Sequence, residues 1–152
     1  MRKFVIGCDN AVVEMKDTLK AFLQKQGAEV EDVGCFSSDD PTNYPTIAEK
    51  ACNLIAESGF EKRGVLVCGT GIGMCMTANK CKGIRAAVGH DIFSARRSIL
   101  SNDGNVICFG ARVIGPELAK AILGEWMTLE YMDGPSTPKV QEIIALEERN
   151  MR

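Results

Sequence analysis

The chain has 152 residues, which is the size of one domain, and its net charge at pH 7 is −2. Its 45% hydrophobic and 25% charged residues are ordinary for a globular protein. The chain has no excess of basic residues that could bind the phosphates of a nucleic acid. No apolar run approaches the roughly 18–20 residues that span a bilayer. We therefore expect a single domain over residues 1–152, with neither nucleic acid nor a membrane as partner.

Short apolar runs alternate with helical patterns along the whole chain. The runs predict five strands, at 3–6, 30–33, 65–67, 84–88 and 106–109. Apolar residues at helical spacing predict a helix after each strand. Gly27 is a plausible stop for the first helix. Thr46 and Asp91 are plausible N-caps of the second and fourth helices, and Pro116 suits the first turn of the fifth.

A sixth helical pattern lies in segment 136–152, after a break at 134–138. It carries an apolar stripe made of Val140, Ile143, Ile144 and Leu146, and we expect the charged end, 147–152, to be a solvated tail. Five strands that are each followed by a helix predict an α/β fold with a five-stranded parallel sheet covered on both faces. The extra C-terminal helix has no strand of its own, so a second subunit is a candidate for covering its stripe.

Seven cysteines are many for this length. They are Cys8, Cys35, Cys52, Cys68, Cys75, Cys81 and Cys108. The chain has no CxxC pair and a single histidine, His90, so we expect no metal site. The N-terminal MRKFVIGCDN reaches glycine and aspartate too soon for a signal peptide. We therefore expect a cytoplasmic protein in which most cysteines are reduced, small, buried side chains.

Ligands of an open parallel sheet bind beyond the carboxyl ends of its strands, where the strand order reverses. In a flavodoxin-like order, that point lies between the first and third strands. Residues 7–10 (Gly-Cys-Asp-Asn) follow the first strand, and residues 68–73 (Cys-Gly-Thr-Gly-Ile-Gly) follow the third. Both segments fall at the switch point, and we place the site there.

Three glycines, Gly69, Gly71 and Gly73, permit a tight turn whose N–H groups could hold an anion, aided by the following helix. The loop is neither a P-loop nor a full dinucleotide fingerprint, and such turns often only join a strand to a helix. Cys68 changes this view, because a thiolate beside a helix N-terminus is stabilised and can remove a proton from carbon. A base next to amides that hold an oxyanion suits aldose–ketose isomerisation through an enediolate.

Simpler roles are open for two of these residues. Cys68 could be a core cysteine, and Asp9 could cap the first helix rather than hold a sugar hydroxyl. Six features taken together, however, resemble one family. They are IGCDN near the N-terminus, NYPTIAEK at 43–50, VCGTGIGMCMTANK at 67–80, GIRAAV at 83–88, SNDGNVICFGARVIG at 101–115 and the helix with Trp126.

The resemblance is to ribose-5-phosphate isomerase B, whose wider family includes the two subunits of galactose-6-phosphate isomerase. It runs in order through about residues 3–134. It implies a Rossmann-like three-layer sandwich that uses no metal or organic cofactor. It also implies a dimer or a dimer of dimers, with the site at the subunit interface.

The resemblance assigns roles to individual residues. Cys68 matches the cysteine that abstracts the proton, and Asp9 and Tyr44 match an aspartate and a tyrosine of the site. Asn102 matches an asparagine that contacts substrate, and Arg112 an arginine that binds phosphate. The enediolate loop corresponds to Gly69, Thr70, Gly71, Ile72 and Gly73, with Thr70 assisting.

Four positions depart from the family pattern. Asn10 and Ser101 stand where ribose-5-phosphate isomerases carry histidines, and the second of these histidines assists ring opening. Pro135 and Lys139 stand where they carry arginines. Serine is no acid–base group near neutral pH, whereas Lys139, which we expect to come from a partner chain, can still meet a phosphate.

Isomerisation of ribose 5-phosphate to ribulose 5-phosphate is the default interpretation. The departures leave open galactose 6-phosphate or another hexose or tetrose phosphate, one subunit of a hetero-oligomer with a paralogue, or a non-catalytic subunit that binds sugar phosphate. If Ser101 reflects a loss of ring opening, we expect the protein alone to act on open-chain sugars better than on sugars locked as rings. His90 lies at the carboxyl end of the fourth strand, where it could act as a substitute acid or simply be exposed beside Asp91.

Overall fold

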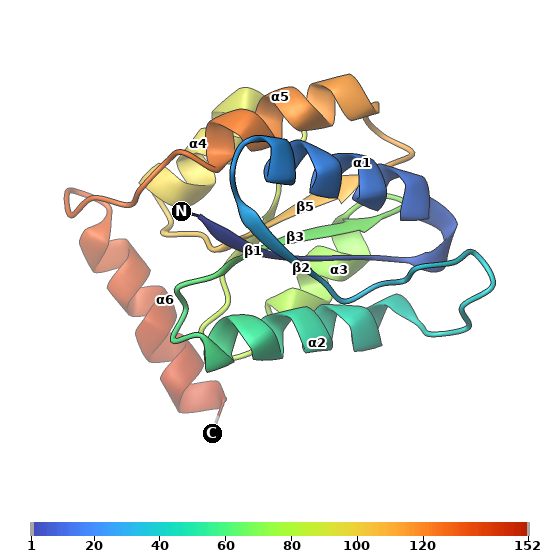
Figure 1. The fold of residues 1–152 in the computed structure, drawn as a ribbon. Coiled ribbons are helices and arrows are strands. Elements are labelled where there is room, and N and C mark those ends of the chain that lie inside the picture. The colour runs from blue at the N-terminus through green and yellow to red at the C-terminus, as the bar shows by residue number, and fades with distance from the viewer. Residues whose placement is uncertain (1, 152) are drawn as a thin grey trace.

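The computed structural model describes residues 2–151, which form one sheet with helices around it (Figure 1). In chain order the elements are β1 (Lys3–Cys8), the 3-10 helix η1 (Asn10–Val12), α1 (Val13–Lys25), β2 (Glu29–Asp32), α2 (Tyr44–Glu57), β3 (Arg63–Cys68), α3 (Ile72–Ala78), β4 (Ala86–Val88), α4 (Ile92–Leu100), β5 (Val106–Gly110), α5 (Pro116–Trp126) and α6 (Thr137–Asn150). All strand pairs are parallel. The predicted three-layer α/β fold is confirmed.

The helices divide between the two faces of the sheet. Helices α2 and α3 pack together on one face, whereas α1 and α4 both pack against α5 on the other (Figure 1). Each face buries its own apolar cluster. One contains Phe4, Trp126 and Phe109, and the other contains Val5, Ile55 and Met74. Strands buried on both sides explain why the apolar runs of the sequence located the strands.

The strand order is β2-β1-β3-β5-β4. The switch point between β1 and β3 is where a flavodoxin-like order places it, but β5 lies beside β3 and β4 forms the edge. The burial of the two strands agrees with this order, because β5 is buried along all five residues whereas the three residues of β4 are only half-buried. Cys8 pairs with Val67 and Cys68 with Gly110, so the carboxyl ends of β1, β3 and β5 meet.

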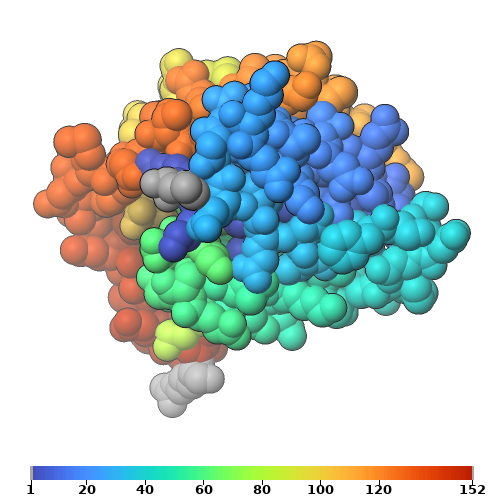
Figure 2. Space-filling model, in the orientation of Figure 1, coloured from blue at the N-terminus to red at the C-terminus, as the bar shows by residue number. Residues whose placement is uncertain are grey.

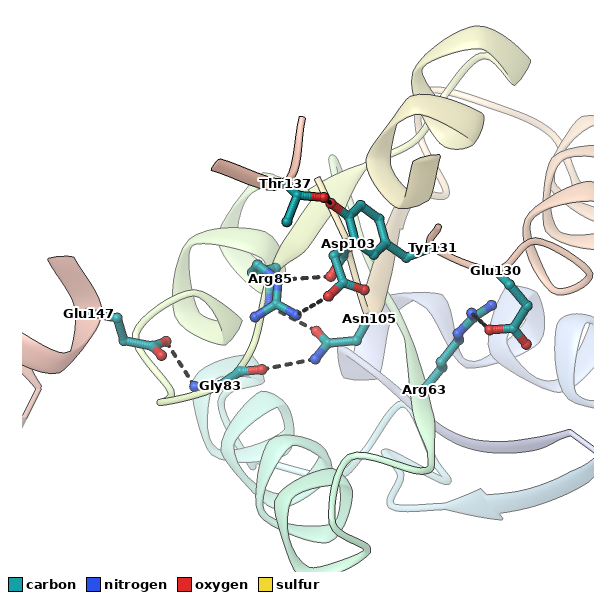
Figure 3. Close-up of polar contacts among 9 residues, drawn as sticks. All are labelled: Arg63, Gly83, Arg85, Asp103, Asn105, Glu130, Tyr131, Thr137 and Glu147. Atoms are coloured by element: carbon teal, nitrogen blue, oxygen red, sulfur yellow. Dashed lines mark hydrogen bonds and ion pairs between the residues drawn. The ribbon is translucent and has the colours of Figure 1, made fainter. Parts of the chain in front are cut away.

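Two predicted element boundaries were wrong. Thr46 lies inside α2, which begins at Tyr44 with Asn43 as N-cap, because Pro45 fits the first turn of a helix. Strand β4 begins at Ala86 rather than Ile84. The Arg85 N–H donates to the Asn105 side chain at 2.8 Å, while the Arg85 guanidinium pairs with Asp103 at 3.1 Å (Figure 3). The predicted Asp91 cap is confirmed, since its carboxylate accepts the Ser94 N–H at 2.7 Å.

The C-terminal helix stands beside the sandwich, at the amino-terminal edge of the sheet (Figures 1 and 2). The expected solvated tail over 147–152 is only partly borne out. Residues 148–150 are exposed, but α6 continues to Asn150 and the Glu147 carboxylate accepts the Gly83 N–H at 2.8 Å (Figure 3). Arg152 lies outside the described residues. On the stripe, Val140 is buried, but Ile143 and Leu146 are 44% and 50% exposed. Part of this apolar surface is thus left uncovered by the chain.

All seven cysteines are free, and five of them are buried. The expectation that most are small buried side chains is confirmed. Among residues 2–151, no helix has the length and apolar character needed to cross a membrane. The same residues contain no group of three or more histidine, cysteine, aspartate or glutamate side chains that could hold a metal ion.

Candidate active site

Cys68 ends the buried strand β3, and the glycine loop folds directly over its sulfur. The Gly71 N–H donates to Cys68 Sγ at 3.1 Å, and the Cys68 side chain is nearly buried. An N–H donor aimed at sulfur stabilises negative charge there. The amides of Gly69 and Thr70 form no backbone hydrogen bond within residues 2–151, so they remain available to a substrate oxygen. A thiol and free amides therefore lie side by side.

Steric constraints explain why glycines occupy two positions of this loop. Gly71 has φ +79°, and a Cβ there would lie 3.0 Å from the Phe109 carbonyl carbon. A Cβ on Gly73 would lie 2.5 Å from the Tyr44 hydroxyl oxygen, so the Tyr44 ring rests on the loop. The loop is held closely between β5 and the start of α2.

Arg112 lies over the other end of the same loop. The Arg112 backbone N–H donates to the Gly69 carbonyl at 3.0 Å. A Cβ added to Gly69 would lie 3.7 Å from a terminal nitrogen of the Arg112 guanidinium. The Arg112 side chain is exposed, and its guanidinium is a fixed positive charge. An anionic group bound above Gly69 would meet this charge.

Asp9 follows β1 and is anchored beside β3, since its N–H donates to the Val67 carbonyl at 3.0 Å. Its side chain forms no capping hydrogen bond with the helix that follows, so the simpler role as a cap is not what this carboxylate does. The neighbouring Asn10 side-chain amide donates to the Asp40 carbonyl at 2.7 Å. Asn10 thereby joins the end of β1 to the loop that precedes α2.

Three predicted site residues lie away from Cys68 in the single chain. Ser101 and Asn102 follow α4, which runs back to the amino-terminal edge of the sheet, and Lys139 is exposed on the first turn of α6. A cavity of about 690 Å³ lies at this edge, between α6 and the β4–α4 segment, and Asn102 lines it. The chain thus presents its predicted residues as two groups at opposite edges of one sheet.

His90 lies on the same edge as Cys68 and is half-buried. The Gly110 N–H donates to His90 Nε2 at 2.8 Å, which requires that nitrogen to be unprotonated. Burial lowers the pKa of His90, and the nearby Asp91 carboxylate opposes this shift. The ring supports the backbone next to Cys68, so the expectation of a simply exposed histidine was wrong.

One group near the site was missed by the sequence reasoning. Lys16 is fully buried in α1, and its ammonium contacts the Asp32 carboxylate at 3.0 Å and the Cys35 carbonyl at 2.7 Å. The signal was present, because Lys16 follows Val12 by four residues and precedes Leu19 by three, so it lies within the apolar stripe of α1.

The family model for the ribose/galactose isomerases matches residues 4–143. The chain belongs to this family. A D-erythrulose-4-phosphate isomerase of Pectobacterium atrosepticum is 46% identical over 143 residues, covering 94% of this chain and 93% of its own. Ribose-5-phosphate isomerase B of Escherichia coli is 41% identical over 149 residues, with 98% and 99% covered.

The fold agrees with solved structures of the family. Ribose-5-phosphate isomerase B of Clostridium thermocellum superposes with a TM-score of 0.91 at 35% identity, covering 97% of this chain and 98% of its own. The protein is therefore a sugar-phosphate isomerase that interconverts an aldose and a ketose. These relatives are named for sugars with different numbers of carbons, four in D-erythrulose and five in ribose.

Proposed function

We propose that the protein interconverts D-erythrulose 4-phosphate and D-erythrose 4-phosphate. The observation that carries the proposal is Ser101, which stands where ring opening calls for an imidazole. Its hydroxyl is already engaged, because Arg97 Nε donates to Ser101 Oγ at 2.7 Å. The 46% identity to a protein named as a D-erythrulose-4-phosphate isomerase supports the same substrate.

Ring chemistry explains why a serine suffices for a tetrose. Pentose and hexose phosphates are mostly closed rings, and opening one requires a proton to be delivered to the ring oxygen. A hydroxyl does not do this near neutral pH. A tetrose 4-phosphate has its terminal hydroxyl esterified, so it cannot close a furanose and it offers an open-chain carbonyl.

The residues around the glycine loop supply the isomerisation itself. The Cys68 thiolate takes a proton from C1 of the ketose, and the electron pair of that C–H bond forms the C1–C2 enediolate. The proton of the O1 hydroxyl then passes to O2, and the proton held by Cys68 returns at C2 to give the aldose. Free amides of the glycine loop hold the enediolate oxygen, with the Thr70 hydroxyl at the same turn. Asp9 holds a sugar hydroxyl. Arg112, exposed above Gly69, meets the phosphate.

A second copy of the chain completes the site in this proposal. Ser101, Asn102 and Lys139 lie at the edge of the sheet opposite Cys68, so one chain does not use both groups on one small substrate. The partly exposed stripe of α6 offers an apolar surface for a second copy. Lys139 would then add a positive charge to the phosphate site.

Ribose 5-phosphate is the second candidate, because the Escherichia coli and Clostridium thermocellum relatives carry that substrate in their names. Steady-state kinetics on D-erythrulose 4-phosphate and ribose 5-phosphate, with wild type and Ser101→His, separates the two. We expect a higher kcat/KM for the tetrose with wild type, and a gain on ribose 5-phosphate with Ser101→His. Efficient turnover of ribose 5-phosphate by the wild type would overturn the tetrose proposal.

A further inference from the structure

Burying the Lys16 ammonium costs free energy because the group loses its contact with water, and its contacts in the folded chain must offset that cost. Its side chain is 0% exposed. The ammonium contacts Asp32 at 3.0 Å, the Cys35 carbonyl at 2.7 Å and the ring of Phe36, whose centroid lies 4.4 Å away. Three of its partners thus belong to the end of β2 and the segment directly after it.

Neutralising Asp32 does not require this burial. Lys20 Nζ already reaches Asp32 Oδ2 at 3.3 Å from the surface, with its side chain 32% exposed. The Gly34 N–H also donates to Asp32, at 2.9 Å. What Lys16 has and Lys20 lacks is contact with the segment after β2, through the hydrogen bond to the Cys35 carbonyl and the Phe36 ring. The contacts that distinguish Lys16 are therefore with the loop that follows β2.

That loop, residues 33–43, is the β2–α2 loop, and it is joined to the end of β1. The Cys35 N–H donates to the Cys8 carbonyl at 2.9 Å, and the Cys8 N–H donates to the Gly34 carbonyl at 2.6 Å. Cys8 immediately precedes Asp9. Lys16 holds the loop at the very residue that pairs with Cys8, so it supports the backbone that carries Asp9.

The far end of the β2–α2 loop borders the site. The Asn10 amide donates to the Asp40 carbonyl at 2.7 Å, and the Thr42 N–H donates to the Asp40 carboxylate at 2.9 Å. Tyr44, whose ring rests on Gly73, follows at the start of α2. The loop lies at the carboxyl-terminal edge of the sheet (Figure 1, and in cyan at the right of Figure 2).

We infer that Lys16 is a positioning residue for substrate binding. By holding the Cys35 carbonyl it sets the β2–α2 loop, and through that loop it places Asn10 and Tyr44 against the substrate. Its ammonium contacts Asp17, Asp32, Cys35 and Phe36, which all lie outside the glycine loop that follows Cys68. The inference rests on the proposed site, but not on which sugar phosphate is the substrate.

The test compares Lys16→Met with Lys20→Met, which removes the same charge from the same carboxylate and leaves the Cys35 contact intact. Hydrogen exchange of residues 33–43 is followed by mass spectrometry, and kcat and KM are measured on whichever sugar phosphate the wild type turns over fastest. For Lys16→Met we expect faster exchange in the loop and a KM raised about tenfold or more. We expect kcat to stay within about threefold, because misplaced binding groups weaken binding while the Cys68 loop is untouched.

A folding failure is handled by the double variant Lys16→Met/Asp32→Asn, which keeps the buried pocket neutral and still lacks the Cys35 contact. It is expected to reproduce the loop exchange and the KM increase. Unchanged exchange, an unchanged KM, or equal effects from Lys20→Met would each overturn the inference. A wild type that prefers ribose 5-phosphate would instead overturn the tetrose proposal and leave this test intact.

Discussion

The two edges of the sheet are built differently. At the carboxyl-terminal edge, backbone packs on backbone, since a Cβ on Gly110 would lie 2.5 Å from the Thr70 carbonyl carbon. At the amino-terminal edge, side chains join the turn before β4 to its neighbours. Asn105 donates to the Gly83 carbonyl at 2.9 Å, and Glu147 accepts the Gly83 N–H (Figure 3). The residues proposed to transfer the proton are thus preformed in one chain. The residues proposed to complete the site lie at the other edge, where part of the apolar surface is uncovered.

Replacing Cys68 by serine tests the preformed half most directly. A serine alkoxide is far harder to generate than a thiolate, so we expect Cys68→Ser to lower kcat by about 10²–10⁴-fold, with little change in KM. Cys75→Ser, at a half-buried cysteine in the adjacent helix α3, is the matched control and should retain most activity. Substantial turnover by Cys68→Ser would remove the cysteine from its proposed role.

Mixing two inactive variants tests whether the second half comes from another copy. Lys139→Glu should lose most activity, because it places a negative charge where the phosphate is to bind. Unfolding and refolding Cys68→Ser together with Lys139→Glu would then create mixed dimers with one intact site each, and about a quarter of the wild-type activity should return. No recovery from the mixture, with mixed dimers demonstrated by mass spectrometry, would argue for a site made by one chain.

The tight backbone packing predicts a smaller effect on stability, with a control inside the chain. Gly71 and Gly27 both have positive φ, at +79° and +89°, but only Gly71 has backbone within 4 Å of an added Cβ. We expect Gly27→Ala to cost about 1 kcal/mol for the left-handed conformation, and Gly71→Ala to cost about 1–3 kcal/mol more for the clash. Urea unfolding of both variants measures the difference in the free energy of unfolding. Equal losses of stability would mean that the backbone around Gly71 shifts to accommodate the added methyl group.

The preformed edge was also the more predictable one. Strands at 65–67 and 106–109 came from apolar runs. The observed β3 is three residues longer than predicted, and β5 is one residue longer. The placement of Asp9 and Cys68 at one edge follows from parallel strands that end there. The exchange of β4 and β5 did not follow, because burial along a strand depends on what lies beside it.

Contacts between distant segments account for the other errors. The end of α6 reads as a charged tail, yet Glu147 finds a backbone N–H at Gly83, 64 residues away. Lys16 lies within the apolar stripe of α1, but no neighbouring residue in the sequence indicates that its partners are Asp32 and the Cys35 carbonyl. In both cases a charged side chain is held by partners that only the folded chain brings near.

The smallest effect concerns pH and the support of the Cys68 edge by His90. Its Nε2 accepts the Gly110 N–H only when unprotonated, and burial lowers its pKa below the ordinary 6.5. As the pH falls below about 6.5, the unfolded chain therefore binds the proton first, so stability declines until the pH passes the folded-state pKa of His90. Above about pH 7 both states are neutral at this residue, and it contributes no slope.

His90→Gln, which has no titrating group, should remove this part of the pH dependence. We expect the loss of Tm between pH 7.5 and pH 5.5 to be smaller in His90→Gln than in wild type. Asp91 adds little to the change in Tm over this pH range. Its pKa is lowered from 3.8 by the Ser94 N–H, so its carboxylate stays charged throughout. Equal losses of Tm in the two proteins would show that His90 does not link protonation to the packing of Gly110 beneath Thr70.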